Sequence, residues 1–303
     1  MLIHTSGLIF PGLYLLTLGN SAHYLLESEQ ECTLFDPGLS VHITPLMMRL
    51  EQLHFKPQEL SQVFLTHLHP ERVGGVPQLR KLNPDLKVFG SAAMKTKLQD
   101  PEFKRLIFEE DLRLSAQYPE APAFKAMDFD EYQDLLFIDK TFPESQTFNF
   151  ADNLAIRAIF AHGHTSESVL YLVLPHNAII LDESLGYFRG KDMAAPGGDA
   201  DLEESLKIAT TLKDFELNAM CFPNGGLITG ALVHKHIEAI IQNTKDLLSQ
   251  CEIAFKHKIS AETIRESVQN SFYANNSPDP LMRTTLDRSF EAVWQQIFSA
   301  FGD

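Results

Sequence analysis

Short apolar runs bounded by turn residues recur along the chain and predict β-strands. The runs Leu13 to Leu18 and His23 to Leu26 flank the turn Gly19-Asn20-Ser21, so they predict a hairpin. A third strand is predicted from Cys32 to Phe35. Apolar residues spaced three and four apart between about 43 and 55 then predict an amphipathic helix.

The alternation of strand and helix continues through most of the chain. Further strands are predicted at 63–65, 86–89, 135–138, 147–150, 154–160, 169–174, 178–181 and 219–222, with a helix at about 201–215 and helical patterns from about 231 to 303. This order predicts an α/β fold with sheets and helices in layers. Residues from about 92 to 135 break the rhythm, and we interpret them as a helical insertion.

Composition limits the class of protein. The 303 residues are 44% hydrophobic and 21% charged, which is typical of a globular protein with an ample core. With 25 basic and 40 acidic residues the net charge is −15, which argues against nucleic acid or an anionic membrane as a partner. Three cysteines form no disulfide framework, and the N-terminus lacks the basic region of a signal peptide, so the expected location is cytoplasmic.

The stretch Thr66-His67-Leu68-His69-Pro70-Glu71-Arg72-Val73-Gly74-Gly75 carries the strongest chemical signal. In an extended or tightly turned segment, histidines at i and i+2 can point toward one atom, whereas on a helix they would diverge. The carboxylate of Glu71 adds an oxygen ligand of the kind that divalent metals accept beside imidazole. The alternative is that both histidines are ordinary surface or capping residues.

Other predicted strands also end in polar residues that can bind metals. Asp36 follows the strand 32–35, His164 follows 154–160, and Asn224 follows 219–222. The strand 178–181 ends in two adjacent carboxylates, Asp182 and Glu183. Polar groups gathered at one edge of a sheet are where α/β folds usually place their ligands.

These segments, taken in order, resemble the five motifs of the metallo-β-lactamase superfamily over about residues 10 to 240. The matching stretches are LFDPG, THLHPERVGG, HGHTSES, LDESLG and PNGG. The resemblance implies a four-layer αββα sandwich with a metal at the edge between its sheets. We therefore expect a metallo-β-lactamase-like domain at 1–240, which includes the insertion, and a C-terminal helical extension at 241–303.

The resemblance also implies the ligands of the first metal. His67, His69 and His164 fall on its three histidine positions. A three-histidine set leaves one coordination position open for water. His162, two residues before His164, is a further candidate ligand. Four other histidines have no metal-binding donors near them in sequence and are predicted to be surface or helix residues: His23, His176, His234 and His236.

The second metal site departs from the family pattern. Glu71 stands where an aspartate is expected, Arg72 stands where a histidine is expected, and Asn224 or Gly225 replaces the last histidine. Arginine stays protonated and cannot bind a cation. Arg72 could pair with an anionic substrate or bridge to Asp36, and we expect the bridge. We therefore expect one metal, with a second held weakly at most. Zinc is the expected metal, with iron or manganese as alternatives.

The bridging carboxylate that contacts both metals in the family is either Asp182 or Glu183 in this sequence. The resemblance implies a metal-dependent hydrolase in which metal-bound water attacks a small ester, thioester or lactone. Glu71 or Glu183 is the expected catalytic residue that orients or deprotonates this water. The alternative is a catalytically reduced or inactive member that acts as a ligand-binding or oligomeric scaffold. Core packing or a homodimer face explains the apolar stripes of the C-terminal helices better than a metal or cofactor site does.

Overall fold

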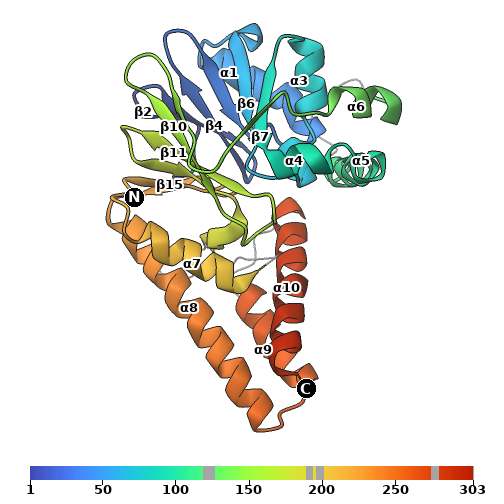
Figure 1. Cartoon of the computed structure of the whole chain (residues 1–303), viewed down its shortest axis with the longest axis vertical. Helices are drawn as coiled ribbons and strands as arrows, with labels where there is room; N and C mark the ends of the chain where they lie inside the picture. Colours follow the sequence, from blue (N-terminus) through green and yellow to red (C-terminus); the bar gives the residue numbers. More distant parts are fainter. Residues whose placement is uncertain (119–126, 189–193, 196–200, 274–279, 303) are drawn as a thin grey trace.

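Two seven-stranded sheets form the centre of the molecule in the computed structural model, which describes residues 1–118, 127–188, 194–195, 201–273 and 280–302. The first sheet has the strand order β2-β3-β4-β5-β6-β7-β8, and the second has the order β1-β16-β15-β12-β11-β10-β9. The sheets face each other, because the Tyr171 ring of the second sheet contacts the rings of Phe35 and Phe64 in the first. Helices cover both outer sides (Figure 1). The predicted αββα sandwich is confirmed.

The strands fall into two groups in sequence. The first sheet contains β2 (Gly7–Phe10), β3 (Leu13–Leu18), β4 (Ser21–Glu27), β5 (Cys32–Phe35), β6 (Leu60–Phe64), β7 (Lys87–Ser91) and β8 (Lys140–Phe142). The second contains β1 (Leu2–Ile3), β9 (Thr147–Asn149), β10 (Ala155–Phe160), β11 (Val169–Leu174), β12 (Ala178–Ile180), β15 (Ala219–Cys221) and β16 (Leu227–Thr229). A separate antiparallel pair is formed by β13 (Tyr187–Phe188) and β14 (Ala194–Ala195).

The helices also divide by position. The sandwich and its insertion contain α1 (Ile43–Gln52), α2 (Pro70–Val73), α3 (Val76–Leu82), α4 (Ala92–Lys97), α5 (Pro101–Ser115), α6 (Phe129–Leu135) and α7 (Leu202–Leu212). The C-terminal part contains α8 (Ala231–Lys256), α9 (Ala261–Tyr273) and α10 (Pro280–Phe301). The described residues also form the short 3₁₀ turns η1 (Ser40–His42), η2 (Pro57–Glu59) and η3 (Glu183–Leu185).

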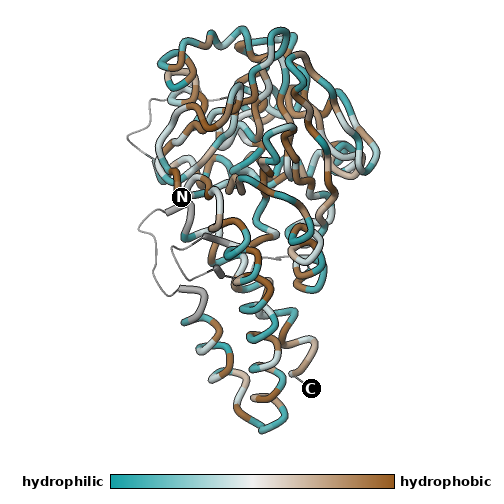
Figure 2. Tube along the Cα trace, turned by 90° about the vertical axis from the view of Figure 1, so that its left-hand side faces the viewer, coloured by the Kyte–Doolittle hydropathy of each residue, from teal (hydrophilic) through white to brown (hydrophobic). Residues whose placement is uncertain are grey.

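Strand β11 shows why its sequence is apolar throughout. Val169, Tyr171 and Val173 face the core between the sheets, whereas Leu170 and Leu172 face the opposite side. On that side α7 and α8 cover the second sheet, so both faces of the strand are buried. The hydropathy trace shows apolar positions throughout the sandwich and along the C-terminal helices (Figure 2).

The C-terminal helices project from the sandwich as a helical unit (Figure 1). Their apolar stripes pack within the chain, in a cluster that includes Leu202, Cys251, Ile264, Val268, Phe290, Val293, Trp294 and Ile297. The expected division between residues 240 and 241 falls inside the continuous helix α8. In the part of the chain that the structure describes, no helix has the length and apolar character needed to cross a membrane.

Most of the predicted strands are present, and Leu13–Leu18 and Val169–Leu174 have the predicted bounds. The predicted strand at 135–138 is wrong, because Leu135 ends α6 and the next strand begins at Lys140. The Asp128 side chain caps α6 by accepting a hydrogen bond from the Glu131 N–H. Four consecutive apolar residues suit a helix end as well as a strand. The short strands β1, β2 and β16 were not predicted.

The helical insertion is confirmed in its described part, which contains α4, α5 and α6, while residues 119–126 lie outside the described residues. Helix α5 packs against α2, the helix that follows the histidine loop. The two meet at Gly74, where a Cβ atom would collide with the Asp111 carboxylate of α5. A Cβ on Gly75 would collide with the Ile43 side chain. The Gly-Gly pair therefore permits close packing around the start of the site.

Candidate metal centre

Loops from both sheets meet at one edge of the sandwich. Strand β6 leads into the loop that carries His67 and His69, and β10 leads into the loop that carries His164. Two hydrogen bonds join these parts: the Val169 N–H donates to Thr66 O at 2.8 Å, and the Tyr171 hydroxyl donates to Leu65 O at 2.6 Å. These two hydrogen bonds fix the position of one sheet relative to the other next to the histidines.

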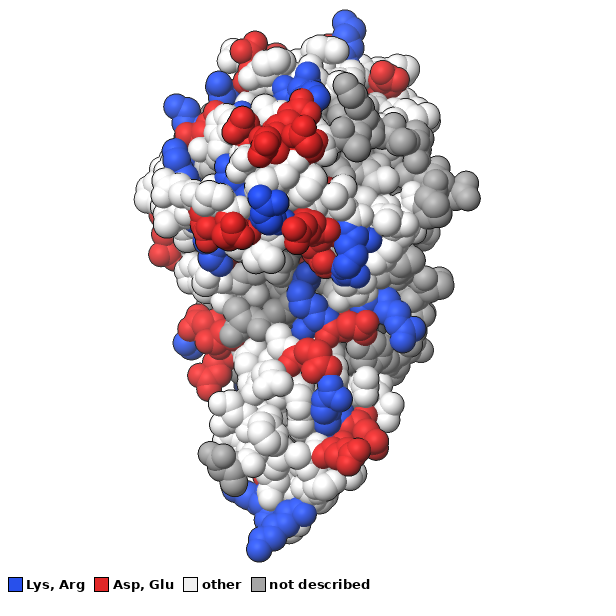
Figure 3. All heavy atoms as spheres, turned by 90° about the vertical axis from the view of Figure 1, so that its right-hand side faces the viewer, with Lys and Arg blue, Asp and Glu red and all other residues white. Residues whose placement is uncertain are grey.

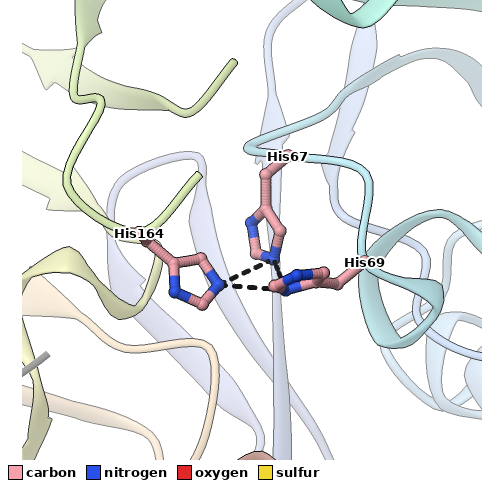
Figure 4. A group of neighbouring side chains, drawn as sticks. All are labelled: His67, His69 and His164. Atoms are coloured by element: carbon pink, nitrogen blue, oxygen red, sulfur yellow. Dashed lines mark hydrogen bonds between the residues drawn. The ribbon is translucent and has the colours of Figure 1, made fainter. Parts of the chain in front are cut away.

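The three histidines point their ring nitrogens toward one another (Figure 4). His67 Nε2 lies 3.0 Å from His69 Nδ1, and His164 Nε2 lies 3.3 Å and 3.0 Å from these two atoms. Two imidazole nitrogens bound to one zinc at about 2.0–2.1 Å would lie roughly 2.8–3.4 Å apart. The donor set and its spacing therefore fit a single metal ion.

Buried contacts select the form of His67 that can bind a metal. Thr66 Oγ1 donates to Asp36 Oδ2 at 2.6 Å, so it accepts a hydrogen bond from His67 Nδ1 at 3.0 Å. The proton is thus on Nδ1, and the lone pair of Nε2 faces the other histidines. Burial first, and then the neighbouring His164 and Arg72, hold the pKa of His67 well below its usual value. The ring is therefore neutral, as metal binding requires.

His69 shares this environment. Burial, followed by the charge of Arg288, holds its pKa well below the usual value. Thr66 links His67 to Asp36 in a relay of hydrogen bonds. Burial raises the pKa of Asp36 to about 7, while Arg72 and the hydrogen bonds from Thr66 lower it. The Thr66 N–H also donates to Asp36 Oδ1 at 2.8 Å. Asp36 thus orients His67 through Thr66.

Glu183 supplies the carboxylate beside the histidines. Its Oε2 lies 3.2 Å from His164 Nε2 and 3.7 Å from His67 Nε2, and this oxygen has no hydrogen-bond partner. A buried carboxylate oxygen without a partner is costly. Burial alone would raise the pKa of Glu183, but Arg72 and His164 hold it below its usual value. An ionised oxygen therefore faces the nitrogens, where it can serve as a further metal ligand.

Asp182, the other candidate, makes different contacts. Its carboxylate accepts hydrogen bonds from Ser184 N at 2.8 Å and Ser184 Oγ at 2.9 Å, which cap η3. Ser184 Oγ in turn accepts a hydrogen bond from the His164 N–H at 3.1 Å. The structure thus brings Glu183 to the histidine nitrogens, while Asp182 supports the backbone of the His164 loop.

Arg72 contacts the other oxygen of Glu183. Its Nη2 donates to Glu183 Oε1 at 2.7 Å, its Nη1 donates to Pro223 O at 3.3 Å, and both side chains of this ion pair are fully buried. The Asn224 amide lies 3.1 Å from Nη2, and the surrounding donors assign the near atom as Oδ1. The predicted bridge to Asp36 is wrong, because the guanidinium hydrogen-bonds Glu183 and the β15 loop. Arg72 thus neutralises the carboxylate that would contact a second metal.

Glu71 is fully buried in the short helix α2. One oxygen, Oε1, accepts a hydrogen bond from Arg288 Nη2, and the other, Oε2, has no hydrogen-bond partner. Burial by itself would raise the pKa of Glu71, but Arg288 and Arg72 lower it below the usual value. Arg288 belongs to α10, 217 residues further along the chain. No pattern around Arg288 in the sequence predicts this contact.

The remaining histidines divide between surface and core. His162 is exposed and its ring contacts Phe160, so it does not join the histidine cluster. The prediction that His23 is a surface or helix residue is wrong: it lies in β4, is fully buried, and its Nδ1 lies 2.7 Å from Asp36 O. His236 is a helix residue, as predicted, and it is buried, with Nε2 3.2 Å from Leu185 O. Both support loops of the site.

The family comparison is direct. A family model described as the metallo-beta-lactamase superfamily matches residues 16–176, which is more than half of the chain. The matched region contains His67, His69 and His164.

Curated relatives match over shorter stretches. Hydroxyacylglutathione hydrolase from Klebsiella pneumoniae subsp. pneumoniae is 34% identical over 73 residues, which are 24% of this chain and 27% of that protein. The enzyme of the same name from Yersinia enterocolitica is 40% identical over 68 residues, which are 22% of this chain and 25% of that protein. The matches thus span about a quarter of the length of these relatives.

Solved structures show the likeness in fold. An archaeal metallo-beta-lactamase superfamily protein from Sulfolobus tokodaii has a TM-score of 0.62 at 17% identity and covers 94% of this chain and 98% of its own. A metallo-beta-lactamase family protein from Thermus thermophilus also has a TM-score of 0.62, at 16% identity, and covers 86% of this chain and 88% of its own. With the family match and the histidine cluster, these findings lead to one conclusion: the chain belongs to the metallo-beta-lactamase superfamily.

Proposed function

We propose that this protein is a metal-dependent hydrolase of small esters, thioesters or lactones. The observation that carries the proposal is the cluster of three ring nitrogens 3.0–3.3 Å apart, with the unpartnered Oε2 of Glu183 3.2 Å and 3.7 Å from two of them. Neutral imidazole and carboxylate are the ligands of hydrolytic zinc sites. A bound zinc ion lowers the pKa of its water toward neutrality, which supplies a nucleophile.

Two ionised carboxylates can take part in the chemistry. Glu183 faces the histidine nitrogens with Oε2, while its other oxygen is held by Arg72. Glu71 keeps one oxygen on Arg288 and the other without a hydrogen bond. We assign metal binding to Glu183 and the orientation or deprotonation of water to Glu71. Glu183 as the base and Glu71 as a ligand are the reverse assignment.

We propose one tightly bound metal, most favourably zinc, with iron or manganese as alternatives. Arg72 supports this number, because a buried guanidinium within 2.7 Å of Glu183 repels a second cation. Metal analysis of the purified protein tests it. Arg72→His should raise the metal content only if a second site is latent, and no change would identify Asn224 or Gly225 as the greater departure.

The substrate class rests on two arguments. The matched relatives are named as hydrolases of hydroxyacylglutathione, which is a thioester, so a thioester is the first choice. The net charge of −15 opposes nucleic acid and anionic membranes as partners. On the face drawn in Figure 3, acidic and basic side chains of the described residues are interspersed, with no continuous basic patch.

Location and assembly stay predictions. The three cysteines are buried and free, which supports a reducing compartment such as the cytoplasm. The predicted homodimer through the C-terminal helices has less support, since their apolar stripes pack inside the chain. Light scattering of the purified protein measures the oligomeric state.

A panel of esters, thioesters and lactones, assayed with added Zn²⁺, Mn²⁺ or Fe²⁺, tests the proposed activity. About one equivalent of metal and hydrolysis that both disappear in the double variant His67→Ala, His69→Ala would support the proposal. Exposed His162→Ala is the control and should change neither. Metal without hydrolysis of any substrate class would favour the alternative, a scaffold that keeps the fold and has lost the reaction. No metal in either protein would refute the proposal.

A further inference from the structure

An ion pair connects the C-terminal helical unit to the metal centre. Arg288 of α10 donates to Glu71 of α2, although the family match ends at residue 176. The beginning of α10 lies beside the sheet sandwich, and its end lies at the far tip of the helical unit (Figure 1). This contact therefore joins the C-terminal helical unit to the sheet sandwich beside the candidate metal centre.

The two side chains of this ion pair are buried to different extents. The Glu71 side chain is 1% exposed and the Arg288 side chain is 29% exposed, so the carboxylate is inside the protein and the guanidinium lies at its rim. An ionised carboxylate without a partner at such a position is strongly destabilising. The charge of Arg288 also acts on His69 and on Glu183, which both belong to the proposed metal site. Arg288 thus interacts electrostatically with His69 and Glu183 as well as with Glu71.

The helix that carries Arg288 is firmly held. Phe290 and Val293 of α10 are buried in the apolar cluster of the helical unit. The Gln296 side chain accepts a hydrogen bond from the Leu202 N–H at 2.7 Å, which ties α10 to the start of α7. Such an anchor can fix the position of the guanidinium, and with it the position of Glu71.

We propose that Arg288 is a positioning residue of the metal centre: it holds Glu71 in the orientation in which its second oxygen serves the metal and its water. The helical extension then belongs to the active site. This inference rests on the metal site of the proposed function, although not on any particular substrate.

Binding of Co²⁺ to the metal-free protein tests the proposal, followed by its visible absorption and by competition with a chelator. Four proteins form a cycle: wild type, Glu71→Gln, Arg288→Gln and the double variant. Arg288→Gln should weaken Co²⁺ binding about tenfold and change the spectrum, because Glu71 loses its orientation. In the Glu71→Gln background, the same substitution should change binding less than about twofold.

Two further variants control the result. Arg288→Lys keeps the charge and should restore binding to within about threefold of wild type. Arg265→Gln removes the exposed Arg265–Glu291 ion pair of the same helical unit and should leave binding within about twofold. If a substrate is found, Arg288→Gln should lower kcat and change KM little.

Several outcomes would overturn the positioning role. Tighter Co²⁺ binding by Arg288→Gln would mean that Arg288 acts only by repelling the cation. An equal effect in both Glu71 backgrounds, or no effect in the wild-type background, would mean that Arg288 does not act through Glu71. If wild type binds Co²⁺ and hydrolyses no substrate, the proposed function fails while this cycle still decides the role of Arg288.

Discussion

The two halves of the site carry charge in different ways. The histidine half, consisting of His67, His69 and His164, places ring nitrogens 3.0–3.3 Å apart, and burial holds the pKa of His67 and of His69 well below the usual value. The arginine half, consisting of Glu71, Arg72, Glu183 and Arg288, contains two carboxylates and two guanidiniums in two ion pairs. The histidine half can bind a cation from solution, whereas the carboxylates of the arginine half are already paired with guanidinium groups. A fixed guanidinium can thus replace the charge of a metal ion without its chemistry.

The largest loss of stability is expected when an ion pair of the arginine half is broken. Arg72→Met leaves Glu183 buried without its partner, so the metal-free protein should lose about 3–5 kcal/mol of its free energy of unfolding. Urea unfolding in the presence of a chelator measures this loss. Arg113→Met is the control, because it removes an exposed Arg–Glu pair and should cost at most about 1 kcal/mol. Equal losses in the two variants would show that Glu183 does not depend on Arg72.

Breaking the histidine half should affect the metal first. His164→Ala removes one of about four ligands and should weaken zinc binding by about 3 kcal/mol, which is roughly a hundredfold in Kd. Metal-free stability should change only by the ordinary cost of a substitution, about 1 kcal/mol. Chelator competition and urea unfolding measure the two quantities. If metal-free stability fell as far as in Arg72→Met, the proposed difference between the halves would be wrong.

A buried acid near the arginine half predicts a pH dependence of stability. Burial raises the pKa of Asp111 from 3.8 to about 6, although hydrogen bonds from Ser40 oppose the shift. The folded state therefore binds this proton more tightly than the unfolded state, so stability should fall as the pH rises from about 4 to 6. Asp111→Asn should remove a cost of up to about 3 kcal/mol above this range and have no such benefit below pH 4. Unfolding curves between pH 4 and 8 test the prediction, and a pH-independent difference would contradict it.

The smallest expected effect tests the support of the histidine half. Thr66→Val breaks the relay from Asp36 to His67 and should weaken zinc binding about 10–100-fold. Thr66→Ser keeps the hydroxyl and should bind zinc almost as wild type does. Isothermal titration of the metal-free proteins compares them. Identical affinities of the valine and serine variants would show that the relay does not orient His67.

Local patterns were sufficient for much of the fold and for half of the site. Strand β11 has its predicted bounds because its apolar residues are contiguous and are flanked by Ser168 and Pro175. The trio of His67, His69 and His164 could be named because each residue follows a strand in a short, recognisable segment. The strand predicted at 135–138 failed because an apolar run does not distinguish a strand from the end of a helix.

The choice between Asp182 and Glu183 required the structure. The two residues are adjacent, and both are carboxylates at the end of a strand, so their sequence context is the same. The turn of η3 ties Asp182 to Ser184, which leaves Glu183 facing the histidines. The partner of Arg72 could not be predicted, because Glu183 lies on a loop of the other sheet. The burial of His23 depends on how the segment with Asp36 and His42 packs against β4.

The sequence alone predicted a layered α/β fold and a candidate histidine metal site, because strand periodicity and the spacing of His67 and His69 lie within short segments, and the family resemblance added His164. The tertiary structure decided how the charges around that site are paired. Arg72 meets Glu183 across 111 residues, and Arg288 meets Glu71 across 217. Such contacts depend on how the sheets and the C-terminal helices pack, and no local pattern of residues encodes that arrangement.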